Sequence, residues 1–214
     1  MISAEQFKQA AWNSDFEMVK RFVEAGGDIH ACGNNGVGAL VTFNTEILDY
    51  LVSHGASPAM HWDDGSPAIG FYAWEVNLES FKWFLEQGVD PDIQHLVTGE
   101  NCLHSLCAKP LELDKRLVAI RLLIDHGIDV NRKTKTGIET GGYMRDVCVV
   151  GETALHRAAA YQSREVIELL LQAGADKTLK DSHGESPLSW ASRHWRERDI
   201  LKLLLYGKYE DSII

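Results

Sequence analysis

Three residues whose side chains could bind a metal ion lie close together in this sequence: Cys102, His104 and Cys107. Thiolate sulfur and imidazole nitrogen are the ligands that zinc prefers. Their spacing, however, is not that of a standard zinc knuckle. We therefore predict that the chain has no metal site and that both cysteines are small buried thiols, the common state of an unpaired cysteine.

Catalysis by a serine or cysteine nucleophile would need a neighbouring base, and that base would need a third group to orient it. The sequence holds nine histidines and several serines, so chance combinations are easy to find. It contains no nucleophile-elbow, phosphate-loop or His-Glu-x-x-His motif. We therefore predict a protein that is not an enzyme and that uses no cofactor.

Composition narrows the classes of partner and the location. The formal net charge is 21 minus 31, or -10, which disfavours nucleic acid because binding to phosphates depends on clustered Lys and Arg. No apolar run is long enough to span a bilayer, and no leader of cationic then apolar residues opens the chain. The four cysteines lack the spacing of a disulfide framework. These features favour a cytoplasmic location, no membrane partner and a monomer.

The elements that would position a binding site are helices, and residues 151–183 are their template. Thr153 is a good N-cap for a short helix that ends with the small residues 158–160. Apolar residues then recur at helical spacing from Val166 to Leu171, and Gly174 stands where a left-handed C-cap is needed. The pattern restarts at Gly184, 33 residues after Gly151. Because neither helix can bury its apolar face alone, the unit predicts stacked neighbours.

These residues resemble the ankyrin repeat. Thr153-Ala-Leu-His156 and Ser186-Pro-Leu-Ser189 are similar to its Thr-Pro-Leu-His signature, and Leu170-Leu171 with Gly174-Ala-Asp176 is similar to its ending. The resemblance implies an all-α solenoid. It also implies that the signature histidines, His104 and His156, make structural hydrogen bonds between adjacent repeats, which is a second reason to predict no metal at His104.

Endings of the Leu-Leu-x-x-Gly type occur six times along the chain, at Gly26, Gly55, Gly88, Gly127, Gly174 and Gly207. Successive glycines are 29, 33, 39, 47 and 33 residues apart. We therefore predict a single ankyrin-like domain over residues 1–214, built from about six helix-turn-helix repeats. The first and last pairs are expected to be divergent caps, and the other length changes should fall in turns and connections.

Three length changes need separate explanations. The second pair is short, and Gly36–Phe43 leaves room for about two helical turns. The fourth pair carries extra residues near Lys109-Pro110, which predict a longer turn because proline ends the helix. Residues 132–150 form a long insertion in a finger, which we interpret as an extended hairpin or a mobile flap. Its basic residues could dock an acidic partner or simply be solvated.

The resemblance implies non-catalytic binding of a partner protein in a concave groove, lined by finger tips and by the first helix of each pair. Carried over by position, the predicted partner-binding residues are His61, Trp62, Asp63, Asp64, Trp74, Glu75, His95, Tyr161, Lys180, His183, Arg193 and His194. Exposed aromatic residues among polar groups are typical of interface anchors. The alternative for Trp62 and Trp74 is that they pack together or fill the space left by the short second pair. Two other functions stay open: a regulatory inhibitor of a partner enzyme, and an enzyme with an unrecognised site.

Overall fold

The computed structural model describes residues 2–34, 36–108, 112–139 and 148–207 of the chain. The chain divides into two compact units, Met1–Leu96 and Val97–Ile214, and each is described by itself. In both units the described residues are mainly helical, with one short pair of strands in the second. The fold is an all-α solenoid of helix pairs, as predicted.

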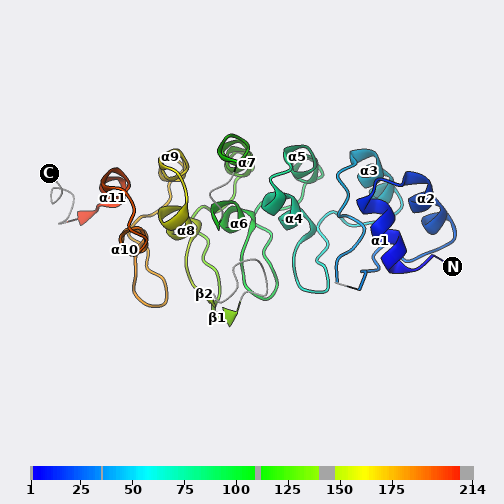
Figure 1. Ribbon diagram of the computed structural model, residues 1–214, viewed down its shortest axis with the longest axis horizontal. Helices are drawn as coiled ribbons and strands as arrows, with labels where there is room; N and C mark the ends of the chain where they lie inside the picture. Colours follow the sequence, from blue (N-terminus) through cyan, green and yellow to red (C-terminus); the bar gives the residue numbers. More distant parts are fainter. Residues whose placement is uncertain (1, 35, 109–111, 140–147, 208–214) are drawn as a thin grey trace. The chain divides into compact units, whose positions relative to one another are not determined.

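The first unit contains five helices in its described part (Figure 1). They are α1 (Ala4–Trp12), α2 (Phe16–Glu24), α3 (Thr45–Ser53), α4 (Ala68–Glu75) and α5 (Leu78–Glu86). Helices α1 and α2 form one pair and α4 and α5 another, while α3 packs against α5. The predicted capping box at the start of α1 is present, because Ser3 and Gln6 bond each other's backbone N–H groups.

The prediction of a first helix in the second pair is wrong. Residues 36–43 form turns, and α3 is the one helix of that pair in the described chain. The physical reason lies in Tyr72 of α4, whose hydroxyl is placed to donate to the carbonyl oxygens of Leu40, at 3.0 Å, and Thr42, at 2.6 Å. The single O–H of a side chain from the next pair is thereby shared between two carbonyls of the segment, of which Thr42 is the nearer, in place of an internal helical bond.

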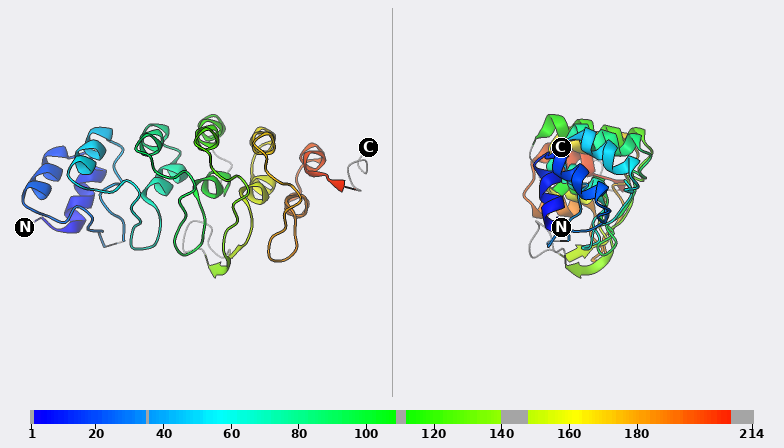
Figure 2. Two further views of the ribbon diagram at one scale, coloured as in Figure 1. Left: turned by 180° about the vertical axis from the view of Figure 1, so that it is seen from behind. Right: turned by 90° about the vertical axis from the view of Figure 1, so that its right-hand side faces the viewer.

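The second unit contains six helices and two strands in its described part (Figure 1). They are α6 (Cys102–Ala108), α7 (Leu113–Asp125), β1 (Thr136–Glu139), β2 (Cys148–Val150), α8 (Ala154–Tyr161), α9 (Arg164–Gln172), α10 (Pro187–Arg193) and α11 (Arg198–Leu204). Helices α6, α8 and α10 pack side by side in an inner row, and α7, α9 and α11 form an outer row. Figure 2 shows the two rows from behind, with the finger loops below the inner one.

The insertion begins and ends as a hairpin. Strands β1 and β2 are antiparallel, with Ile138 opposite Val149, and their register shifts at Gly137, whose φ is +72°. Such a bulge needs the left-handed backbone that glycine adopts without strain. The expected extended hairpin therefore fits the described ends of the insertion, while residues 140–147 lie outside the described residues.

The predicted longer turn of the fourth pair falls on residues 109–111. Helix α7, which follows it, has 13 residues, four more than the 9 of each of the corresponding helices α5 and α9. Residues 109–111 lie outside the described residues.

A cap in the first unit gives a local test of the fold. The side chain of Asn77 accepts a hydrogen bond from the backbone N–H of Ser80 at 2.9 Å, at the start of α5. Asn77→Ala is expected to lower the free energy of unfolding by about 1 kcal/mol, because the N–H loses its partner. Urea denaturation measures this change. Lys82→Ala, at an exposed ion pair of the same helix, should cost about 0.5 kcal/mol or less, and equal losses in both variants would contradict the prediction.

Candidate partner-binding site

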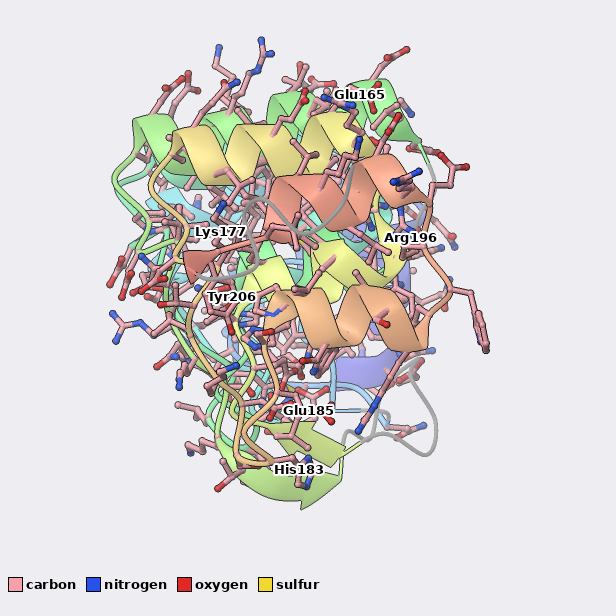
Figure 3. The ribbon with its side chains drawn as sticks, turned by 90° about the vertical axis from the view of Figure 1, so that its left-hand side faces the viewer. Glu165, Lys177, His183, Glu185, Arg196 and Tyr206 are labelled. Carbon is pink, nitrogen blue, oxygen red and sulfur yellow. The ribbon has the colours of Figure 1, made fainter. Side chains whose placement is uncertain are left out.

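The second unit has a pocket of about 240 Å³ where the inner helices meet a finger. Figure 3 looks at this end of the unit and shows His183 and Glu185 on the finger below α10. Helices α8 and α10, with the C-cap residue of α10, supply five of the other eight side chains. The lining residues are Val150, Glu152, Arg157, Tyr161, Asp181, His183, Glu185, Trp190, Arg193 and His194.

Four of the predicted partner-binding residues meet in this pocket: Tyr161, His183, Arg193 and His194. The rings of Tyr161 and His194 contact each other edge to face, with centroids 4.8 Å apart. Both residues lie at the ends of adjacent inner helices, so the stacking of α8 against α10 brings them together. Lys180 is not part of the pocket lining, and its ammonium donates to the Tyr206 hydroxyl at 2.8 Å.

A buried ion-pair network lies at the base of the pocket, and the sequence analysis missed it. The Arg157 guanidinium contacts Glu152 at 2.5 Å and Glu100 at 2.6 Å, and Arg157 is 4% exposed. Glu152 also accepts hydrogen bonds from the Thr134 hydroxyl at 2.7 Å and the Val150 N–H at 2.8 Å. The network therefore joins α8 to the base of the hairpin and to the preceding finger.

The electrostatics of this network keep both carboxylates ionised. Burial alone would raise the pKa of Glu152, but the charge of Arg157 and the hydrogen bonds from Val150 and Thr134 lower it to about 2. The pKa of Glu100 is lowered in the same way, against its own burial, by Arg157. A signal for the network was present in the sequence, because an arginine beside Ala158, Ala159 and Ala160 needs a buried counter-charge.

The walls of the pocket are fixed by the finger. Asp181 accepts hydrogen bonds at 2.9 Å from the N–H groups of His183 and Glu185 and from the Trp190 indole. Arg193 forms an ion pair with Glu185. These contacts orient His183 and Arg193 at the rim, where both are exposed.

The signature histidines behave differently from each other. His156 Nε2 lies 3.1 Å from the carbonyl oxygen of Glu185, so it links adjacent repeats as the resemblance implies. His104 is fully buried, and its Nδ1 lies 2.6 Å from the Asn101 amide oxygen. Cys102 and Cys107 are buried free thiols, as predicted. Within the described part of the chain, no group of three or more His, Cys, Asp or Glu side chains could hold a metal ion.

The predicted partner-binding residues of the first unit differ in how far they are exposed to solvent. Asp63, Asp64 and Glu75 are exposed, whereas Trp74, His61 and His95 are half-buried. His61 Nε2 lies 2.9 Å from the Gln94 carbonyl, which fixes one finger against the next.

The expectation that Trp62 is an exposed anchor is wrong, because Trp62 is 6% exposed. A methyl group on Gly38 would lie 3.3 Å from the indole nitrogen of Trp62. Trp62 therefore packs against the short second pair, which is the space-filling alternative. The absence of a side chain at Gly38 is what leaves room for the indole.

The comparisons with known proteins agree with this architecture. A family model described as ankyrin repeats in three copies matches residues 69–181 and 141–212. The chain belongs to the ankyrin-repeat family. A chain with the same fold occurs in the solved complex of the Bd0816 predatory endopeptidase from Bdellovibrio bacteriovorus with immunity protein Bd3460. That match has a TM-score of 0.70 and 21% identity and covers 94% of this chain and 97% of the other.

Curated relatives share parts of this ankyrin-repeat chain. The ankyrin repeat domain-containing protein OPG023 of Cowpox virus (strain Brighton Red) is 30% identical over 172 residues, 76% of this chain and 24% of that protein. Protein phosphatase 1 regulatory subunit 12A of Mus musculus is 42% identical over 66 residues, 30% of this chain and 6% of that protein. The ankyrin-repeat chain thus spans a quarter or less of these relatives. In the described residues, each helix is too short or too polar to cross a bilayer.

Proposed function

We propose that this ankyrin-repeat chain is a non-catalytic module that binds a partner protein along its inner helices and fingers. The observation that supports this proposal most is that one pocket brings together four residues, although the first and last are 33 positions apart in the sequence: Tyr161, His183, Arg193 and His194. The pocket would receive one side chain of the partner. We also propose that residues 1–214 act as a single monomeric domain in the cytoplasm.

The chemistry of the pocket supports binding over catalysis. Its lining contains no serine, cysteine or threonine that could serve as a nucleophile. Its buried carboxylates are committed to Arg157, and its Asp181 is committed to N–H groups of the chain. The ankyrin-repeat family is generally a non-catalytic interaction module. A regulatory inhibitor would use the same surface and differ in its partner, and one relative is by name a regulatory subunit of a phosphatase.

Capture from native lysate tests this proposal. The double variant His183→Ala/His194→Ala removes two exposed side chains that line the pocket and should reduce capture of the native partner at least tenfold, because the side chain bound in this pocket would lie at the centre of the interface, where contacts dominate affinity. The control is His54→Ala/His126→Ala, two exposed histidines just after outer helices, which should capture the partner normally.

Undiminished capture by the rim variant would refute the pocket as the binding site. Any captured enzyme is then assayed with and without the wild-type chain. If the captured enzyme loses activity when the chain is present, the chain is an inhibitor of that enzyme. If the enzyme's activity is unchanged, the chain binds it without inhibiting it.

A further inference from the structure

The first unit has an exposed aromatic cluster where the second pair lacks its first helix. Trp12 ends α1, Phe43 ends the turn segment 36–43, and Phe71 lies on α4. Their ring centroids are 5.5 to 5.8 Å apart in all three combinations. We call these three residues the aromatic patch. Trp12 is 44% exposed and Phe43 is 38% exposed, so a large part of their apolar surface faces solvent.

The patch follows from the missing helix. In the second unit, α8 packs directly between α6 and α10, and its small residues lie buried between them. In the first unit, the turn segment 36–43 stands where the second pair would have its first helix, so it presents the ring of Phe43 and no helix face. Three aromatic rings in mutual contact bury part of one another and leave their outer faces open. Such a cluster on a soluble unit marks an interaction site.

An exposed carboxylate adjoins the aromatic patch. Glu75 lies one helical turn after Phe71 on α4 and is exposed. Asp63 is also exposed, and it lies in the finger beside Cys32 and Gly36. The cation one turn before Trp12 is Lys8, and its ammonium is paired with Glu5 at 2.7 Å. The exposed charge next to Phe71 on α4 is therefore negative.

The negative charge of the chain is concentrated in the first unit. Residues 1–96 contain 4 Lys and Arg against 14 Asp and Glu, a balance of 4 minus 14, or -10. Residues 97–214 contain 17 of each kind, a balance of zero. The whole net charge of the protein therefore belongs to the unit that carries the aromatic patch. A negative unit attracts cationic segments and repels nucleic acid and anionic lipid surfaces.

We propose that the aromatic patch binds a basic segment of a partner protein, one that places a large apolar side chain between Lys or Arg residues. The apolar side chain would cover the open faces of the rings. The cations would lie over the aromatic faces and near Glu75, where both cation–π attraction and charge attraction act. This inference rests on the proposed protein-binding function and adds a second contact surface with a defined partner chemistry.

Titration calorimetry with a synthetic peptide tests the inference on the full-length chain. The probe is a ten-residue peptide of alternating Arg and Leu with one central Trp, and the comparison peptide has Glu in place of each Arg. The basic peptide should bind at least tenfold more tightly than the acidic one. Raising the salt concentration from 50 to 500 mM should weaken its binding severalfold, because exposed charges are screened.

Two variants locate the site. Trp12→Gln/Phe43→Gln should weaken binding of the basic peptide at least tenfold, and Glu75→Gln should weaken it less while flattening the salt dependence. Trp195→Gln is the matched control, because Trp195 is 93% exposed but lies in the second unit, and it should bind the peptide normally. Circular dichroism checks that each variant is folded.

Equal affinity for the basic and acidic peptides would overturn the inference. Unchanged affinity in Trp12→Gln/Phe43→Gln, or a loss in Trp195→Gln, would do so as well. The rim variant His183→Ala/His194→Ala reports on the proposed function separately. If it loses the native partner while the patch variant keeps both partner and peptide, only the inference about the patch fails.

Discussion

Arg157→Met is expected to lower the free energy of unfolding by about 3–5 kcal/mol, because it leaves charges buried without a partner. Glu152 is 2% exposed and keeps its hydrogen bonds to Thr134 and Val150, so it cannot turn toward water. Methionine fills much of the arginine volume, so the loss reports mainly on charge. Urea denaturation at pH 7 measures it.

An exposed ion pair of similar composition is the control for this prediction. Arg164 contacts Glu168 at 2.7 Å on α9, and both side chains are more than a third exposed. Arg164→Met should cost about 1 kcal/mol or less, because water and salt screen the pair. The triple variant Arg157→Met/Glu152→Gln/Glu100→Gln should recover a large part of the loss. If Arg157→Met lowers the free energy of unfolding no more than Arg164→Met does, the network does not stabilise the contact of α8 with the hairpin and the preceding finger.

Lowering the pH from 7 to 4 is expected to destabilise the protein by about 3 kcal/mol through His104 alone. Burial, and next the charge of Arg157, lower the pKa of His104 from 6.5 to about 4, and Glu152 and Glu100 only partly oppose them. Between these two values the unfolded chain binds a proton on this side chain and the folded chain does not. Stability therefore falls as the pH drops through this window and changes no further through His104 below pH 4.

The test compares unfolding free energies at several pH values between 7.5 and 4. His104→Asn should flatten the pH dependence between 6.5 and 4, whereas His126→Asn, at an exposed position, should retain it. His156 adds to the same window, since burial lowers its pKa as well. Glu152 affects the stability at lower pH than the histidines do, because its stabilising negative charge is lost as the pH falls from about 4.5 toward 2. Identical curves for wild type and His104→Asn would contradict the assignment.

The parts of the fold that depend on local residues were predictable from the sequence. Ser3 caps α1 through residues three positions away, and Gly174 follows α9 with a φ of +91°. Segment 36–43 was not predictable in this way. Its carbonyl groups at Leu40 and Thr42 share the hydroxyl of Tyr72, which lies 30 or more residues further along the chain, and no local pattern reports such a contact.

In the candidate site, too, features fixed by local sequence were predictable and features fixed by distant contacts were not. Tyr161 and His194 lie in one pocket because each occupies the end of a first helix, and the repeat spacing visible in the sequence fixes those ends. Trp62 was misplaced because its burial depends on the missing side chain of Gly38 in another finger. Arg157 was overlooked because its role depends on Glu100 and Glu152, which flank the long insertion.

The turn segment 36–43 also bears on how the first unit loses its structure. In a stack of repeats, stability passes from neighbour to neighbour through the faces that adjoining pairs share. Around the second pair, one of the two customary helix contacts is missing, so α1 and α2 are coupled to α4 and α5 through a reduced interface. The amide hydrogens of α1 and α2 should therefore exchange with solvent deuterium before those of α5, in a separate opening event of lower free energy.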